Sequence, residues 1–240
     1  MTNNTSLGKL YLIPVTVGES DPMDVLPQTV KRTIELIDHY IVENEKTARK
    51  SIKGVLPEKK QSELVLFALN KHTDAKEHLS FIQPLLAGKN MGLMSEAGCP
   101  GVADPGAVIV KLAHEKGIQV IPLVGPSSIL LAMMASGMNG QSFTFNGYLP
   151  IDKGEKKSAL KNFEKLSFDK NQSQIFIETP YRNNKLLEDI LQALQPSTHL
   201  CIATDITLPT EYIKTLRVTD WKKTKVDLHN RPTIFIIHKM

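Results

Sequence analysis

Short apolar runs alternate with longer runs of helical periodicity through the first half of the chain. Lys9 to Ile13 is a β-type run that Pro14 ends, and Gln28 to Ile37 repeats apolar residues at helical spacing. This alternation predicts an α/β domain in which strands lead into helices. We expect strands over 9–13, 40–42, 64–69, 91–94 and 120–123, and helices over 28–37, 45–52, 78–86, 107–116 and 129–136.

The second half has more strands per helix. A lysine-rich helix is expected over 156–166, and a second over 185–194 has its leucine and isoleucine side chains on one face. The pattern predicts strands over 174–177, 199–203, 212–218 and 233–238. We therefore infer two α/β domains, residues 1–123 and 124–240, of which the second contains a mixed sheet.

Composition narrows the class of protein. The chain has 240 residues, 41% hydrophobic content and two cysteines, too few for a disulfide framework or a cysteine metal cluster. No apolar run approaches the roughly 18 residues that span a bilayer, and the polar start of the chain does not resemble a secretory signal. We expect a soluble, cytoplasmic protein without a metal site, whose net charge of +4 is compatible with a nucleic-acid partner.

Two loops at predicted strand ends are candidates for ligand binding. The loop from Ser95 to Gly106 combines glycines, which let the backbone approach a ligand closely, with prolines that stiffen it. The second loop, Val124 to Ser128, follows the next predicted strand. Neither a P-loop nor a G-x-G-x-x-G fingerprint occurs, so phosphate cradling is not supported. The alternative is that these glycines and prolines only form turns.

Five segments carry a resemblance to a known family. Ser95 to Gly106 is similar to the signature S-D-A-G-x-P-x-x-x-D-P-G, with Glu96 in place of Asp. Four shorter segments also match in order and spacing: Leu10 to Pro14, Pro122 to Ser128, Gly147 to Pro150 and Glu178 to Arg182. From Gly8 to about Ile237 the chain thereby resembles the tetrapyrrole-methylase superfamily of S-adenosylmethionine-dependent methyltransferases, in the branch of ribosomal RNA small-subunit methyltransferase I.

The resemblance implies a methyl donor held in a cleft between two α/β domains, contacted mainly by backbone, and a homodimer. If the family's site residues are transferred to matching positions, residues of the two loops would surround the donor. Residues of the second domain would close its far side, and Val17 and Gly18 would lie under the cleft. These residues are Val17, Gly18, Gly98, Cys99, Pro100, Val102, Asp104, Ser127, Ser128, Thr179, Ala203, Pro232 and Thr233.

The chain departs from the branch pattern on the substrate side. The branch usually has P-T-P-I-G-N-L after its first strand and E-D-T-R after its second, where this chain has P-V-T-V-G-E-S and Glu43 to Lys46. Its E-L-T-K becomes Asp205 to Leu208, and its terminal G-E becomes Arg231-Pro232. The chain matches the branch pattern more closely in the cofactor loops than in these substrate-side segments.

Methyl transfer to a ribose 2′-hydroxyl requires removal of the hydroxyl proton, for which a carboxylate is suited. Glu19, Glu43 and Glu96 follow three predicted strands and are the candidate bases. Each is equally compatible with an ordinary helix cap or solvated carboxylate.

A lysine group after Pro150 is a candidate surface for an RNA backbone. It comprises Lys153, Lys156, Lys157, Lys161 and Lys165, with Tyr148 and Phe163 as nearby rings, and Lys222, Lys223 and Lys225 near Trp221 as a possible extension. The alternative is a solubilising helix face.

Three functions stay open at this stage. The first is a methyltransferase that modifies a ribose of small-subunit ribosomal RNA, and the second is a methylase of a tetrapyrrole or other small molecule. The third is a cofactor-binding module that has lost methyl transfer. The lysine group favours the first over the second.

Overall fold

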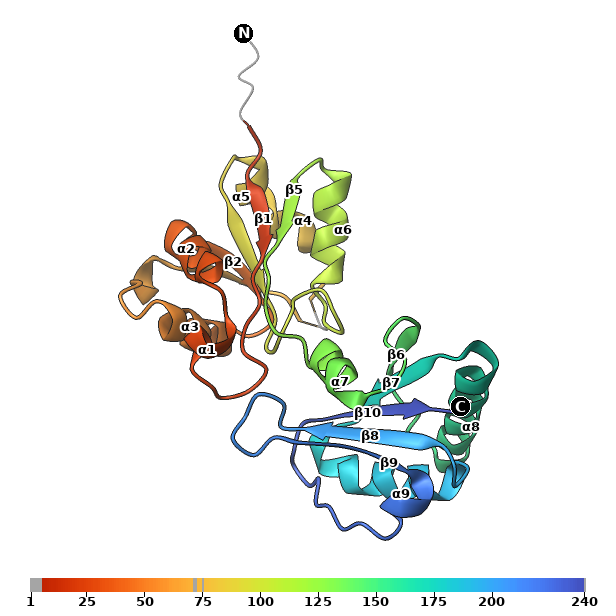
Figure 1. The fold of residues 1–240 in the computed structure, drawn as a ribbon. Coiled ribbons are helices and arrows are strands. Elements are labelled where there is room, and N and C mark those ends of the chain that lie inside the picture. Colours follow the sequence, from red (N-terminus) through yellow and green to blue (C-terminus); the bar gives the residue numbers. More distant parts are fainter. Residues whose placement is uncertain (1–5, 71–72, 75, 240) are drawn as a thin grey trace. The chain divides into compact units, whose positions relative to one another are not determined.

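The computed structural model describes residues 6–70, 73–74 and 76–239 (Figure 1). The polar N-terminal residues 1–5 lie outside this range. The chain divides into two compact units, unit 1 (Met1–Ser127) and unit 2 (Ser128–Met240). This division and the one inferred from the sequence, after residue 123, both fall between the last strand of unit 1 and the first helix of unit 2.

Unit 1 is built on a five-stranded parallel sheet of order β3-β2-β4-β1-β5. The strands are β1 (Lys9–Leu12), β2 (His39–Val42), β3 (Val65–Ala68), β4 (Met91–Met94) and β5 (Gln119–Pro122). Every strand of a parallel sheet ends at the same edge, so the loops after β1, β2, β4 and β5 gather there. The central strand β4 is buried along its whole length.

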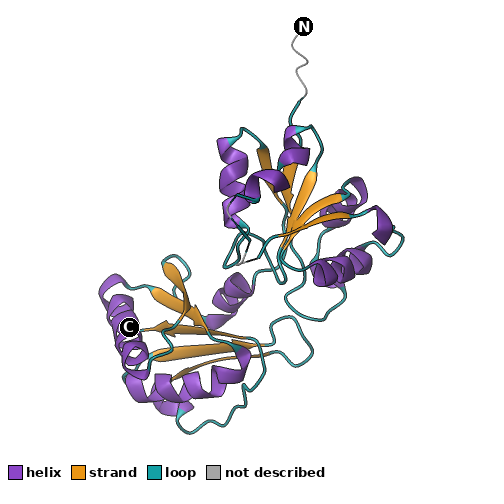
Figure 2. Ribbon diagram, turned by 180° about the vertical axis from the view of Figure 1, so that it is seen from behind, coloured by secondary structure: helices purple, strands orange, loops and turns teal. Residues whose placement is uncertain are grey.

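Helices cover both faces of the unit 1 sheet (Figure 2). One core lies under the helices between β1 and β3, and a second core lies under those between β3 and β5. Pro84 divides the helix expected over 78–86 into two short helices, because proline lacks the N–H that would continue the ladder. The helices are α1 (Pro22–Val25), α2 (Gln28–Leu36), α3 (Glu45–Val55), α4 (His78–Phe81), α5 (Gln83–Leu86) and α6 (Ala107–Glu115), with a 3₁₀ turn over Gln61–Glu63.

Unit 2 contains a mixed sheet of order β6-β7-β10-β8-β9. Strands β6 (Phe143–Tyr148) and β7 (Ser173–Ile177) are parallel, whereas β8 (His199–Thr204), β9 (Tyr212–Arg217) and β10 (Thr233–His238) pair antiparallel. Helix α7 (Ser128–Ser136) packs on one face of this sheet. The other face is covered by α8 (Lys153–Lys170), α9 (Asn183–Ala193) and α10 (Val218–Trp221), and a 3₁₀ turn spans Pro180–Arg182.

Further elements differ from the sequence-based expectation, among them α8, which is longer at both ends than the helix expected over 156–166. Strand β6 was not expected, because it is an edge strand with an irregular register near Gly147, whose φ is +65°. Helix α1 has only four residues, too few for a periodic signal. The strand expected over 212–218 ends at Arg217, since Val218 begins α10.

Among the described residues, no helix is both long enough and apolar enough to cross a membrane. The two cysteines, Cys99 and Cys201, are free thiols.

Candidate functional site

The signature loop Ser95–Gly106 leaves β4 and is held by one carboxylate. Asp104 accepts hydrogen bonds from the backbone N–H of Gly101 at 2.8 Å and of Gly106 at 2.7 Å. Burial raises the pKa of the Asp104 carboxyl, although the two N–H donors oppose that rise. Gly101 has a φ of +83°, which a side chain would strain. The loop is therefore a closed turn with a fixed backbone.

Two neighbouring loops attach to this turn. The Val15 N–H donates to the carbonyl oxygen of Gly98 at 3.0 Å, and the Cys99 thiol donates to the carbonyl oxygen of Pro126 at 3.3 Å. A Cβ at Gly125 would lie 2.2 Å from the Pro14 ring. The loops after β1, β4 and β5 thus form one packed edge, and only glycine fits where the first and last meet.

The structure places the predicted donor-binding residues of unit 1 on this edge. Val17 lies beside Gly98, because a Cβ at Gly98 would be 3.5 Å from a Val17 methyl carbon. Pro100 is buried, whereas Val102 is exposed. Gly18 and Ser127 are half-buried in the loops after β1 and β5, and the next residue, Ser128, is half-buried as the first residue of α7 and of unit 2.

Two of the three candidate bases come together. The Glu43 carboxyl accepts a hydrogen bond from the Glu96 backbone, and Glu43 lines a small hollow with Pro100 and Asp104. Burial, and next the negative charge of Asp104, raise the pKa of Glu43. Glu96 itself is exposed and accepts from the Thr47 hydroxyl at 3.4 Å.

Glu19 has a different environment. Its carboxylate is exposed and forms an ion pair with the Lys50 ammonium at 2.7 Å, and the hydrogen bond from Lys50 lowers the Glu19 pKa. A base that works near neutral pH benefits from a raised carboxyl pKa. The raised pKa of Glu43 therefore suits a general base better than the lowered pKa of Glu19 does.

The predicted residues of unit 2 gather at one edge of its own sheet. Ile234 of β10 pairs with Ile177 of β7 and with Ala203 of β8, so that Thr179, Ala203, Pro232 and Thr233 are neighbours. Buried Glu178 accepts from the Thr179 N–H at 2.7 Å and from Arg182 Nη2 at 2.7 Å. These bonds hold the start of the loop after β7.

A second set of contacts at this edge was missed by sequence reasoning. The carbonyl oxygen of Pro232 accepts from the Asp205 N–H at 3.0 Å, and the Arg231 guanidinium pairs with the Asp205 carboxylate at 2.7 Å. The sequence did contain one sign of this pair: Asp205 and Arg231 both stand at positions where the methyltransferase branch has other residues.

The structure corrects part of the predicted lysine surface. Lys156 is buried in an ion pair with Asp189 at 3.3 Å, because its position on α8 faces α9, whereas Lys157 and Lys161 are exposed. Two of the rings considered for base stacking belong to the core. Phe163 stacks on Phe176, and Trp221 is buried with its indole N–H donating to the Leu200 carbonyl oxygen.

No group of three or more histidine, cysteine, aspartate or glutamate residues suited to a metal ion occurs in the described part of the chain. The polar groups of the unit 1 edge are backbone amides and carbonyls, together with the Asp104 and Glu43 carboxyls.

Comparison with known proteins agrees with this chemistry. The family model described as Tetrapyrrole (Corrin/Porphyrin) Methylases matches residues 9–221. The ribosomal RNA small subunit methyltransferase I of Buchnera aphidicola subsp. Schizaphis graminum is 27% identical over 99% of this chain and 80% of its own length. The protein of the same name from Escherichia coli O157:H7 is 30% identical over 88% of this chain and 69% of its own length.

Solved structures share the fold at low sequence identity. The methyltransferase CobJ superposes with a TM-score of 0.65 at 14% identity, over 97% of this chain and 94% of its own. A uroporphyrin-III C-methyltransferase from Thermus thermophilus, complexed with S-adenosylhomocysteine, has a TM-score of 0.58 at 16% identity, over 97% and 98% of the two chains. The family model spans most of both units, so the chain belongs to the tetrapyrrole (corrin/porphyrin) methylase family and, within it, to the group of proteins named ribosomal RNA small subunit methyltransferase I.

Proposed function

We propose that this S-adenosylmethionine-dependent methyltransferase modifies small-subunit ribosomal RNA, at a ribose 2′-hydroxyl. The observation that carries the proposal is the closed turn of Asp104, which holds the signature loop against the loops after β1 and β5. Relatives that align with most of this chain are named for methylation of small-subunit ribosomal RNA.

The unit 1 residues fit a donor bound through its adenosine and amino-acid parts. Gly98 has a φ of +70°, and a Cβ there would lie 3.3 Å from the Pro126 carbonyl oxygen, so a glycine at this position lets the loops after β4 and β5 approach closely. In the proposal, Gly98, Cys99, Pro100, Val102 and Asp104 surround the donor. Ser127 and Ser128 hydrogen-bond it, and Val17 and Gly18 lie below it.

Unit 2 contributes Thr179, Ala203, Pro232 and Thr233 to donor binding in the same proposal. Their support is local rigidity: the Thr233 hydroxyl donates to the Thr204 hydroxyl at 2.9 Å, and the Thr179 N–H is held by Glu178. Fixed backbone groups lose little freedom on binding, which favours affinity.

The bound donor supplies an electrophilic methyl carbon on its sulfonium. What the chain must add is orientation of the acceptor and removal of its proton. We assign proton removal to Glu43, because its raised pKa and its place beside the signature loop suit a general base. Glu96 holds Glu43 through its backbone, and Glu19 stays a weaker candidate because it is engaged by Lys50.

Donor uptake is the first test. Isothermal calorimetry should detect binding of S-adenosylhomocysteine to the purified chain. Asp104→Ala should weaken it at least tenfold, because two backbone N–H groups lose their acceptor and the turn opens. Asp74→Ala, at an exposed aspartate of unit 1, is the matched control and should leave binding unchanged. Absence of uptake by the folded parent chain would refute the proposal.

Acceptor identity is the second test. Label from methyl-labelled donor should enter RNA when the protein is incubated with small ribosomal subunits from a strain that lacks the corresponding enzyme. Glu43→Gln should reduce the rate by about 10²–10⁴, the usual contribution of a general base, while donor uptake persists. Label found only in a tetrapyrrole or another small molecule would mean that this molecule, and not RNA, is the methyl acceptor. Uptake of the donor without transfer of its methyl group would indicate a binding module.

The proposal includes a homodimer, which rests on the family resemblance, and a cytoplasmic location, which rests on the cysteine content and the polar start of the chain. Light scattering coupled to size exclusion should give twice the mass of the 26.7 kDa chain. A monomer at micromolar concentration would contradict this part alone.

A further inference from the structure

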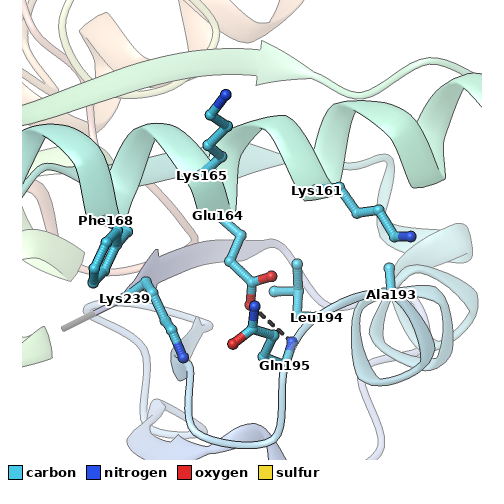
Figure 3. Close-up of a pocket in the computed structure, with 8 residues that line it drawn as sticks. All are labelled: Lys161, Glu164, Lys165, Phe168, Ala193, Leu194, Gln195 and Lys239. Atoms are coloured by element: carbon cyan, nitrogen blue, oxygen red, sulfur yellow. Dashed lines mark hydrogen bonds between the residues drawn. The ribbon is translucent and has the colours of Figure 1, made fainter.

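A pocket in unit 2 lies outside the residues assigned to donor binding. It has a volume of about 670 Å³ and is bounded by the C-terminal half of α8, the residues at and after the end of α9, and Lys239 after β10 (Figure 3). Its lining consists of Lys161, Glu164, Lys165, Phe168, Ala193, Leu194, Gln195 and Lys239. Three lysines and one exposed ring thus belong to the lining, and two of the lysines, Lys161 and Lys239, extend on the side of α8 that faces the hollow.

The single carboxylate of the lining is already engaged by protein donors. Glu164 is buried, and its Oε1 accepts from the Gln195 N–H at 2.8 Å, drawn as a dashed line in Figure 3, and from the Thr198 hydroxyl. These two donors offset the negative charge of Glu164 and tie α8 to the loop after α9. The lysines of the lining therefore remain available to an anion.

The cations are spread around the pocket. In Figure 3, Lys161 and Lys239 extend on the same side of α8 as Glu164, whereas Lys165 extends from the opposite side. The Lys239 ammonium contacts the Ser197 hydroxyl, and the Lys239 N–H donates to the Ser167 hydroxyl at 2.8 Å. Lys239 is thus held at the wall, while Lys161 and Lys165 are exposed at its borders.

Phe168 gives the pocket a second kind of contact. Its side chain is 62% exposed, although it belongs to a helix whose other phenylalanine, Phe163, stacks in the core. An exposed ring beside lysines suits a flat apolar group attached to a phosphate, which describes a nucleotide. An acidic peptide would use the lysines but gain little from the ring.

The charge of the chain is concentrated in the same unit. Residues 128–240 contain 15 lysines and arginines against 11 aspartates and glutamates, whereas residues 1–127 contain 14 of each. The whole net charge of +4 therefore belongs to unit 2. A polyanion is attracted to this unit rather than to unit 1.

We propose that the pocket binds a single-stranded segment of RNA, with phosphates on Lys161 and Lys239 and one base stacked on Phe168. This inference rests on the proposed function, for which it supplies an RNA contact within unit 2. Phosphate contacts position a nucleic acid without reading its sequence, so the pocket anchors the substrate and leaves nucleotide choice to the catalytic edge.

The test uses fluorescence anisotropy with a fluorescein-labelled single-stranded 12-nucleotide RNA of mixed sequence, titrated at several KCl concentrations. The pocket variant is Lys161→Gln and Lys239→Gln combined. The matched control, Lys116→Gln and Lys214→Gln combined, removes the same charge from exposed lysines outside the lining. Circular dichroism melts confirm that each variant is folded.

We expect the pocket variant to bind the RNA at least tenfold more weakly, and the control less than threefold more weakly. The slope of log affinity against log salt should become shallower by about 1.4 in the pocket variant, since each of the two phosphate contacts to a single strand contributes about 0.7. Phe168→Ala should weaken binding by about fivefold or more without changing that slope, as loss of one stacked base does. Phe168→Tyr should restore it.

Equal loss in the two double variants, or no loss in the pocket variant, would overturn the inference. So would a 12-residue polyglutamate peptide that binds the parent as tightly as the RNA and is insensitive to Phe168→Ala, because that result indicates an acidic protein partner. Calorimetry with S-adenosylhomocysteine separates the two proposals. If the chain takes up the donor but binds RNA elsewhere, only the pocket proposal is refuted. If it binds RNA at the pocket but does not take up the donor, the proposed function is refuted.

Discussion

The Arg231 guanidinium Nε lies 2.7 Å from Oδ2 of Asp205, 26 positions away in the chain. Asp205 is buried with a φ of +52°, and its carboxylate also accepts from the Thr210 hydroxyl at 2.8 Å. Arg231 further donates from Nη2 to the Thr210 carbonyl oxygen at 2.7 Å. Both members of the pair stand where the branch pattern has other residues, so two apparent departures in sequence form one interaction in the fold.

Removal of Arg231 should destabilise the loop between β8 and β9. Arg231→Met removes the guanidinium and leaves the Thr210 hydroxyl as the donor to the buried Asp205 carboxylate, and we expect a loss of about 1–3 kcal/mol in the free energy of unfolding. Urea denaturation of Arg231→Met, Asp205→Asn and the double variant measures the coupling. Additive losses in that cycle would show that the pair does not act as a unit.

Glu43 should make stability depend on pH in an identifiable direction. Its pKa in the folded chain is raised above the ordinary value of about 4.5, chiefly by burial, so folding favours its neutral form. The contribution of the Glu43 carboxyl to the free energy of unfolding is fully present below the pKa that it has in the unfolded chain. This contribution is lost as pH rises through the pKa that it has in the folded chain. Glu43→Gln should therefore be more stable than the parent at pH 7 and no more stable at pH 4.

Denaturant unfolding across that pH range measures the effect of Glu43. Glu58→Gln, at an exposed glutamate of the same unit, is the control and should follow the parent at every pH. A Glu43→Gln variant less stable than the parent at pH 7 would mean that the hydrogen bond from Glu96 outweighs burial.

Gly125 should tolerate no side chain. The Cβ of Gly125→Ala would lie 2.2 Å from the Pro14 ring, so the loops after β1 and β5 must separate. We expect a loss of about 1–3 kcal/mol in stability, typical of overpacking, and at least tenfold weaker uptake of S-adenosylhomocysteine. Gly140→Ala, where a Cβ meets nothing within 4 Å, should change neither quantity appreciably.

Adjacent lysines on α8 should behave differently. Lys156→Met leaves Asp189 buried, with only Lys185 at 3.6 Å as a remaining partner, and should reduce stability by about 1–3 kcal/mol. Lys157→Met, at an exposed position, should change it by less than about 0.5 kcal/mol. Thermal and urea unfolding test both. Equal effects would contradict the burial of Lys156.

Local patterns determined most of the architecture. The helical spacing of Val30 and Ile34 specifies α2, because those side chains must share the face that meets the sheet. Proline lacks the backbone N–H that continues a helix, and Pro84 accordingly divides the expected helix into α4 and α5. The glycines and prolines of the signature loop likewise specified a stiff turn at the end of a buried strand.

Tertiary structure alone decided the environment of each of several similar side chains. Glu19, Glu43 and Glu96 are alike in sequence, but packing leaves Glu43 half-buried near Asp104 and Glu19 exposed against Lys50. Lys156 and Lys157 are neighbours, and a rotation of one residue along α8 places only the first against α9. The contacts of Asp205 with Arg231 and of Glu164 with Gln195 join positions far apart in the chain. Propensity and periodicity act within a turn or a strand and can be read along the sequence, whereas burial and long-range pairing depend on which surfaces meet when the elements pack.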